Sequence, residues 1–235
     1  MLETGSNTYR WDIENPNGYA NAMGRYKTEK ELEFVLAHIA GQHKDILDLG
    51  GGSGRFAIPL ADRGHHVTVV DVSAEALRLL HRQKDPQKDP RISTLCADFL
   101  THDFENQFEV VLAIESVQFF TAIPFEMLFT KIHSTLRPRG RFVFTELNRR
   151  SWRYGLHTLS DSERFPYNVA GPDDYKTALR NAGFELLSME GFVWMPFTVA
   201  SNSHFVPLFQ SIERAFHLNR WIRQSPWLLI AAERS

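Results

Sequence analysis

A glycine-rich turn is the strongest chemical signal in this sequence. It runs Asp48-Leu49-Gly50-Gly51-Gly52-Ser53-Gly54 and lies between a short apolar run and a helix-like segment. Glycines let the backbone turn sharply and let a ligand approach the main chain, and the helix start beyond them presents free N–H groups to an anion. Asp71 ends the next apolar run, 21 residues after Gly50, a spacing that suits a carboxylate accepting hydrogen bonds from ribose hydroxyls. Together they predict a site for a nucleoside cofactor.

The glycine pattern by itself leaves the identity of the cofactor open. The run Gly52-Ser53-Gly54-Arg55-Phe56-Ala57 matches the dinucleotide fingerprint G-x-G-x-x-A, so an NAD-linked oxidoreductase is an alternative. Such an enzyme would need a catalytic pair such as Tyr and Lys, and the adjacent Tyr175 and Lys176 would face apart on a helix. Asp48, two residues before Gly50, gives the different frame D-x-G-x-G-x-G.

That frame resembles motif I of the class I S-adenosylmethionine-dependent methyltransferases, and further motifs follow in the order of that family. Cys96-Ala97-Asp98-Phe99 resembles the acidic step after the third strand, and residues 108–118 resemble motif IV. The run Leu136–Arg141 resembles the turn before the fifth strand, although Arg139 stands where glycine is usual. With a final segment that resembles the antiparallel seventh strand, the likeness covers about residues 28–235. It is greatest to the small-molecule branch, near the quinone and natural-product (type 11-like) methyltransferases.

The resemblance implies S-adenosylmethionine as the cofactor and a role for each matching residue. The turn glycines would admit its methionine part, Asp48 would orient its ammonium, and Asp71 would bind the ribose. Val72, Asp98 and Phe99 would surround the adenine, and Ile114 and Glu115 would lie beside the sulfonium. An N-terminal aromatic or basic residue often closes over the cofactor in this family, which makes Tyr19 and Arg25 candidates. The full predicted set is Tyr19, Arg25, Asp48, Gly50, Gly52, Gly54, Asp71, Val72, Asp98, Phe99, Ile114 and Glu115.

Methyl transfer asks for little further chemistry, because the sulfonium is already activated and in-line positioning provides much of the rate. An oxygen or carbon acceptor would also need a general base. The catalytic candidates are His157, Glu115 and Glu146, with Gln118 and His204 as further polar groups. No H-E-x-x-H motif or cysteine cluster occurs in the sequence, so no catalytic metal is predicted.

The elements that must position these residues alternate along the chain. Strands are expected at 46–49, 66–72, 91–99, 108–114, 141–147, 184–192 and 227–233, and helices at 28–41, 55–64, from 74, 124–136 and 172–182. This alternation predicts an α/β fold with a mostly parallel sheet. The resemblance makes it a Rossmann-like three-layer sandwich, with seven strands, an antiparallel last strand, an N-terminal helix and helical lid insertions.

We expect one methyltransferase domain over residues 1–235. Its predicted parts are an N-terminal cap at 1–44, a cofactor-binding half at 45–148, and an acceptor-side half at 149–235 with insertions at 149–170 and 193–226. The second insertion carries an apolar helical stripe, which predicts either packing on the core or a lid over an acceptor pocket. The stripe is Phe205, Leu208, Phe209, Ile212 and Phe216.

Composition limits the class of partner. Lys and Arg number 26 against 28 Asp and Glu, a net charge of −2, so no basic excess predicts nucleic-acid binding. One cysteine, no signal-peptide pattern and no apolar run of membrane-spanning length favour a cytoplasmic protein. We expect a small-molecule acceptor and a monomer or homodimer. A non-catalytic S-adenosylmethionine-binding module is the alternative, and it predicts a blocked or absent acceptor pocket.

Overall fold

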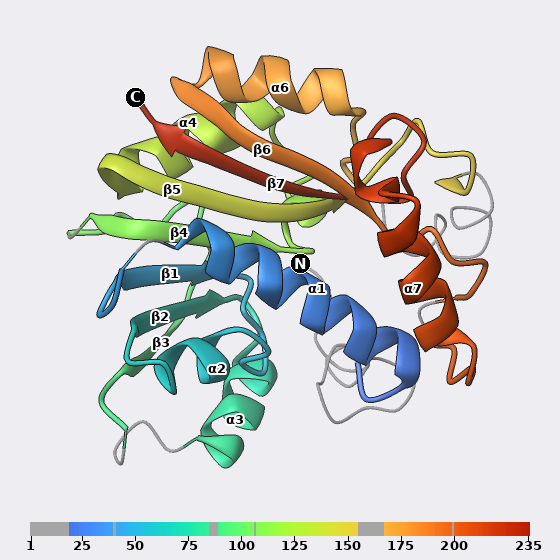
Figure 1. Cartoon of the computed structure of the whole chain (residues 1–235). Coiled ribbons are helices and arrows are strands. Elements are labelled where there is room, and N and C mark those ends of the chain that lie inside the picture. Colours follow the sequence, from blue (N-terminus) through green and yellow to red (C-terminus); the bar gives the residue numbers. More distant parts are fainter. Residues whose placement is uncertain (1–18, 40, 85–88, 106, 155–166, 199) are drawn as a thin grey trace. The chain divides into compact units, whose positions relative to one another are not determined.

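The computed structural model describes residues 19–39, 41–84, 89–105, 107–154, 167–198 and 200–235. These residues divide into two compact units. Figure 1 labels the helices and strands of both. The first unit comprises Met1–Glu105 with Pro196–Pro207, and the second comprises Asn106–Met195 with Leu208–Ser235. Within the described ranges, no helix is both long and apolar enough to cross a membrane.

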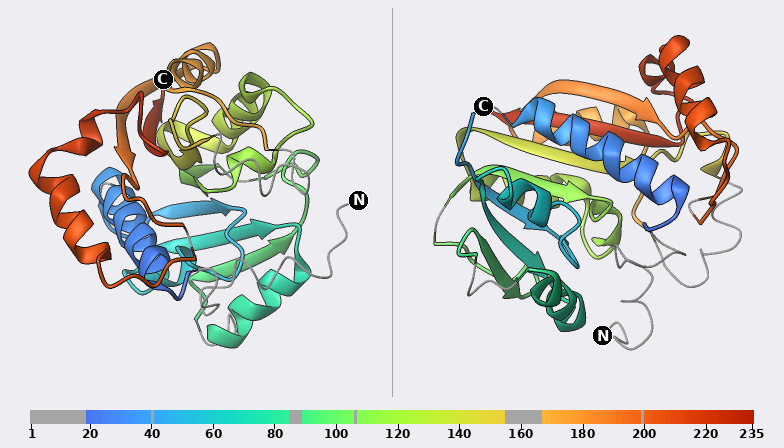
Figure 2. Two further views of the ribbon diagram at one scale, coloured as in Figure 1. Left: turned by 90° about the vertical axis from the view of Figure 1, so that its right-hand side faces the viewer. Right: turned by 60° about the horizontal axis from the view of Figure 1, so that its bottom comes forward.

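The first unit is built on three parallel strands, which lie side by side in Figure 2. They are β1 (Asp45–Leu49), β2 (His66–Asp71) and β3 (Ile92–Cys96). Helices α2 (Ala57–Ala61) and α3 (Ala74–Gln83) lie against β2 and β3. Because the carboxyl ends of parallel strands meet at one edge of a sheet, the segments that follow all three strands start from the same edge.

The N-terminal helix of this unit, α1 (Ala22–His38), begins earlier than Thr28, the start that the sequence predicts. The Asn21 side chain caps it by accepting a hydrogen bond from the Gly24 N–H at 2.8 Å. The spacing of Leu32, Val35, Leu36 and Ile39 predicts one buried apolar face. Val35 and Ile39 are buried, but Leu32 and Leu36 are half-exposed, whereas the charged Lys27 and Glu31 are buried. A search for apolar periodicity misses a face whose buried residues include charges.

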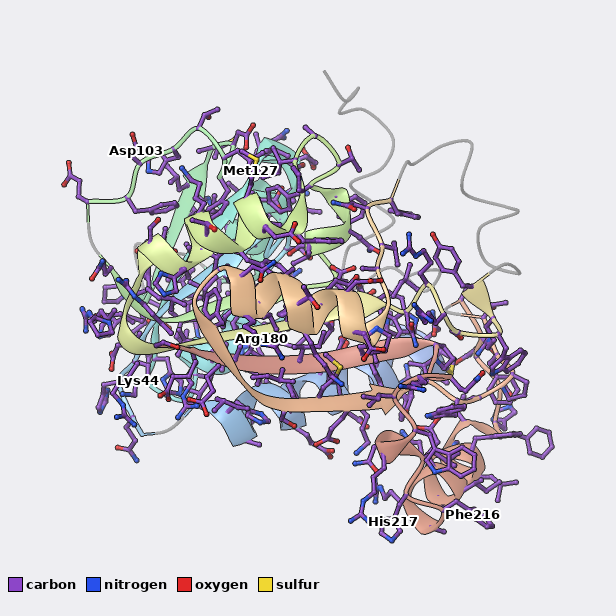
Figure 3. All side chains as sticks on the ribbon, turned by 90° about the horizontal axis from the view of Figure 1, so that it is seen from above. Lys44, Asp103, Met127, Arg180, Phe216 and His217 are labelled. Atoms are coloured by element: carbon purple, nitrogen blue, oxygen red, sulfur yellow. The ribbon has the colours of Figure 1, made fainter. Side chains whose placement is uncertain are left out.

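The second unit contains β4 (Phe108–Ile114), β5 (Leu136–Leu147), β6 (Phe184–Phe192) and β7 (Trp227–Arg234). Strand β4 pairs with β5 in parallel, and β7 pairs antiparallel with both β5 and β6. Helices α4 (Phe125–Thr135) and α6 (Pro172–Asn181) lie side by side in Figures 1 and 3. The strand order β3-β2-β1-β4-β5-β7-β6, with only β7 antiparallel to its neighbours, confirms the predicted seven-stranded, mostly parallel fold.

Aromatic rings form the core between α4, α6 and β5. Phe129 of α4 lies 5.4 Å, centroid to centroid, from both Phe142 and Phe144 of β5. Tyr175 of α6 contacts Phe144 at 5.9 Å and Phe125 at 5.2 Å. These contacts hold both helices on β5, the strand that ends in Glu146 and Leu147.

Two predicted boundaries are corrected by the backbone. The residues 137–140, predicted as a turn before a strand, belong to β5, where an irregular register separates the pairs Phe108–Leu136 and Val110–Arg141. Arg139 there has φ of 61°, so the position at which the family usually has glycine is a left-handed one. Strand β3 ends at Cys96 and not at Phe99, because the chain turns at Asp98.

The apolar stripe in the second insertion is largely exposed. Helix α7 (Val206–Ala215) is followed by a short η3 turn (Leu218–Arg220), and the only buried residue of α7 is Val206. Phe205, Leu208 and Phe216 are 64%, 55% and 69% exposed, and Figure 3 labels Phe216 beyond the helix end. Phe209 and Ile212 are half-buried, so core packing fits these two members of the stripe and not the three exposed ones.

Candidate functional site

The glycine-rich turn follows β1 directly and is tied back to β2. The Gly50 N–H donates to the Val70 carbonyl at 2.7 Å. Gly50, Gly52 and Gly54 have φ of 71°, 55° and 92°, all in the left-handed region. Gly51 is needed for space, because a Cβ there would lie 2.5 Å from Asp48 Oδ2. The turn therefore closes over the Asp48 carboxylate.

Asp48 is the most electrostatically perturbed residue of this turn. Its side chain is 1% exposed, and its Oδ2 atom has no hydrogen-bond partner. Burial raises its pKa, the Arg55 guanidinium lowers it, and nearby Asp71 raises it by a smaller amount, so that the pKa lies at about 7. Buried carboxylates are normally paired, so this unmet acceptor atom fits a cationic donor from a ligand.

Asp71, at the end of β2, is held to the same turn by two backbone donors. Its Oδ2 accepts from the Gly52 N–H at 3.0 Å and its Oδ1 from the Ser73 N–H at 2.8 Å. Burial raises its pKa, and the two hydrogen bonds lower it in part. The next side chain, Val72, is 62% exposed, so an apolar surface borders the fixed carboxylate.

The segment after β3 forms a tight turn. Asp98 is exposed, and its Oδ1 accepts from the Leu100 N–H at 2.9 Å. Phe99 is 2% exposed and packs on Phe104 with ring centroids 5.8 Å apart. Asp98 thus lies at the surface and Phe99 in the core of this unit.

The two N-terminal candidates behave differently. The exposed Arg25 donates to the Ala20 carbonyl and so makes a local contact in the first turn of α1. The Tyr19 ring lies against the Arg55 guanidinium, with 3.9 Å between Cζ and the ring centroid. The structure therefore brings Tyr19 to the arginine that acts electrostatically on Asp48.

A buried ion pair beside the turn was missed by the sequence analysis. Arg55 Nη1 lies 2.6 Å from Glu31 Oε2 of α1, and these side chains are 9% and 0% exposed. The Arg55 guanidinium also lies 4.5 Å from the Phe56 ring centroid. Arg55 is part of the G-x-G-x-x-A match, so the sequence already contained one partner of this ion pair. The local sequence of α1 gives no indication that Glu31 is the other partner.

The second unit brings three of the predicted polar residues together. The Gln118 N–H donates to Glu146 Oε1 at 2.9 Å, and the Gln118 Nε2 donates to the Glu115 carbonyl at 3.2 Å. Glu146 is fully buried, and its Oε2 has no hydrogen-bond partner. Burial raises its pKa well above its ordinary value, and the neighbouring Glu115 raises it further.

Glu115 itself has an unusual backbone conformation. Its φ is 56°, a left-handed value that is uncommon outside glycine, and its N–H donates to both Thr145 O and Thr145 Oγ1 at 3.1 Å. Strained residues of this kind cluster at functional sites. The preceding Ile114, the last residue of β4, is 6% exposed.

The sequence also offered two histidines as candidates. His157 lies outside the described residues, and His204 is exposed. Among the residues that the structure describes, no three His, Cys, Asp or Glu side chains are grouped so as to hold a metal ion.

Comparison with known proteins agrees with this geometry. Residues 46–140 match a family model described as a methyltransferase domain. A ubiquinone biosynthesis O-methyltransferase from Azoarcus sp. is 28% identical over 180 residues, which cover 71% of this chain and 75% of that protein. Phosphoethanolamine N-methyltransferase 2 from Caenorhabditis elegans is 28% identical over 173 residues, and the match covers 71% of this chain but 36% of the longer nematode protein.

Solved structures share the fold. An S-adenosylmethionine dependent methyltransferase from Mesorhizobium loti has a TM-score of 0.65 at 19% identity, covering 92% of this chain and 100% of that chain. The family match spans the glycine turn and Asp71, the two features that predicted a nucleoside cofactor. Residues 46–140 therefore carry a methyltransferase domain whose cofactor is S-adenosylmethionine, and the chain shares the fold of S-adenosylmethionine-dependent methyltransferases.

Proposed function

We propose that this enzyme transfers a methyl group from S-adenosylmethionine to a small, largely apolar organic acceptor, and that residues 1–235 act as one methyltransferase domain. The observation that carries the cofactor part is the buried Asp48 carboxylate, whose Oδ2 has no partner under the glycine turn. The relatives, an O-methyltransferase of ubiquinone biosynthesis and a phosphoethanolamine N-methyltransferase, support a small-molecule acceptor. Its apolar character is inferred from the exposed apolar side chains of the second insertion, such as Phe205 and Leu208.

The residues of the first unit suit this cofactor group by group. Asp48 would receive the ammonium, and the backbone of Gly50, Gly52 and Gly54 would line the methionine part. Asp71 would accept hydrogen bonds from the ribose hydroxyls, because each carboxylate oxygen has a further lone pair beyond the one used by Gly52 or Ser73. When bound, S-adenosylmethionine supplies a methyl group already activated by its sulfonium.

The adenine would lie against Val72, whose exposed side chain is otherwise hard to explain at a strand end. Asp98 would bind the adenine edge from the turn after β3, and the buried Phe99 would support that turn from beneath. Arg25 would have to leave its contact with Ala20 to reach a ligand. From the family resemblance, Ile114 and Glu115 would lie beside the sulfonium.

We infer that Glu146 removes the proton of the acceptor. A general base works best when its pKa is near the working pH, and burial together with Glu115 raises the pKa of Glu146 in that direction. The Gln118 N–H holds one carboxylate oxygen and leaves Oε2 for the acceptor. His157 remains the alternative base.

A methyl-transfer assay tests this function. The enzyme is incubated with S-adenosylmethionine and a panel of small phenols, amines and alcohols, and formation of S-adenosylhomocysteine is measured with and without each acceptor. We expect acceptor-dependent turnover, and calorimetry should show binding of S-adenosylhomocysteine with weaker or no binding of NAD. Tight cofactor binding with no turnover on any acceptor would favour a non-catalytic module, and a preference for NAD would overturn the cofactor assignment.

A further inference from the structure

The Arg55 side chain, which is 9% exposed, interacts with two buried carboxylates of the first unit. Arg55 follows the glycine turn and is paired with Glu31 of α1 at 2.6 Å. It also acts electrostatically on Asp48, at the end of β1. Glu31 and Asp48 come from elements that are distant in sequence, so Arg55 connects the N-terminal helix to the carboxylate under the glycine turn.

The guanidinium is held in place on several sides. The Tyr19 and Phe56 rings lie 3.9 Å and 4.5 Å from Arg55 Cζ, and Thr28 Oγ1 lies 3.4 Å from Nη1. An arginine restricted by stacking and an ion pair keeps its charge at one place. The charge that Asp48 experiences from Arg55 is therefore set by α1 as well as by the turn.

We propose that Arg55 is a positioning residue for the cofactor: anchored by Glu31 of α1, it keeps Asp48 ionised to receive the ammonium of S-adenosylmethionine. This inference rests on the proposed role of Asp48. It adds that affinity for the cofactor depends on a buried contact with the N-terminal helix, and that this dependence changes with pH.

The physical reason is a competition over the charge of Asp48. Burial and the nearby Asp71 favour the protonated acid, and Arg55 favours the carboxylate. The balance leaves the pKa of Asp48 at about 7, so removal of the guanidinium would raise it further. Two further buried charged residues of this unit lie on α1: Glu31, which contacts Arg55, and Lys27 one turn earlier. A protonated Asp48 offers the ammonium no opposite charge.

The test measures binding of S-adenosylhomocysteine by calorimetry between pH 5.5 and 8.5. The main variant is the double substitution Glu31→Gln with Arg55→Met, because Arg55→Met alone would leave Glu31 buried without its partner. Glu31→Gln alone is the matched control. It keeps the positive charge of Arg55, which still acts on Asp48, and removes the negative charge of Glu31 that partly offsets it. Thermal melts establish that each variant is folded before binding is compared.

We expect the affinity of the wild-type enzyme to fall as the pH drops through about 7. In the double variant the midpoint should move up by at least about one unit, which lowers the ionised fraction of Asp48 at pH 7 about fivefold. At the alkaline end the loss should be much smaller. Glu31→Gln should leave the midpoint at the wild-type value or move it down.

Asp48→Asn separates this inference from the proposed function. The Asp48→Asn variant retains Asp71. Its affinity for S-adenosylhomocysteine as a function of pH therefore shows the pH dependence that does not come from Asp48. If Asp48→Asn binds like the wild type at every pH, Asp48 is not the ammonium site and both proposals fail. If Asp48→Asn loses affinity but the double variant weakens binding equally at all pH values, Arg55 is only structural and the inference alone is overturned.

Discussion

Replacing Asp48 by asparagine should stabilise the cofactor-free protein while abolishing the charge that the cofactor needs. The wild-type carboxylate is buried with one unpartnered oxygen, and its pKa is raised from 3.8 to about 7. A raised carboxyl pKa means that the folded state holds a proton which the unfolded state has already released. Stability is therefore lost as the pH rises from about 4 to 7, and the full cost is present above pH 7.

The magnitude follows from the size of the shift. Three pKa units correspond to about 4 kcal/mol as an upper bound, of which about 3 kcal/mol develops between pH 4.5 and pH 8. An asparagine carries no such titration, but its amide can leave a buried donor unpaired at a cost of about 1–3 kcal/mol. We expect Asp48→Asn to raise the free energy of unfolding by about 1–3 kcal/mol at pH 8, and to be neutral or destabilising at pH 4.5.

Urea unfolding without cofactor at the two pH values measures this directly, with S-adenosylhomocysteine binding followed in parallel. Asp173→Asn, at an exposed position of α6, is the matched control, and its effect should be small and nearly equal at both pH values. The reasoning is refuted if Asp48→Asn changes stability by the same amount at pH 4.5 and pH 8, or destabilises the protein more at pH 8.

Three other substitutions test the remaining parts of the site. Asp71→Ala should weaken S-adenosylhomocysteine binding by about 1.5–3 kcal/mol in calorimetry with folding largely intact, and normal binding would mean that Asp71 is not the ribose acceptor. Glu146→Gln should retain cofactor binding but lose most turnover. The wild-type rate should rise as the pH passes the raised pKa of Glu146, and the variant should no longer show this rise. An unchanged pH–rate profile in the variant would exclude Glu146 as the base. Replacing Phe205 and Phe209 by alanine should abolish the acceptor response at unchanged cofactor affinity if the α7 stripe is a lid, whereas unfolding or unchanged turnover would count against that role.

Local chemistry explains what could be predicted from the sequence alone. The strand–turn–helix around Gly50, Gly52 and Gly54 is readable because left-handed backbone conformations are a local steric property that selects glycine. The place of Asp71 follows from its position at the end of an apolar run, since parallel strands end at a common edge. The alternation of strands and helices likewise predicted the fold. The spacing of apolar residues within each strand or helix depends on which faces of that element are buried, and this spacing can be seen in the local sequence.

Tertiary structure determined which of these side chains have shifted pKa values or buried polar contacts, and which apolar faces stay exposed. Glu31 and Arg55 are 24 positions apart, and Gln118 and Glu146 are 28 apart, so neither buried contact leaves a trace in local periodicity. The raised pKa of Asp48 depends on the turn that closes over it and on charges brought in from other elements. Desolvation and ion pairing are properties of a packed environment, and that environment exists only after segments far apart in sequence have come together.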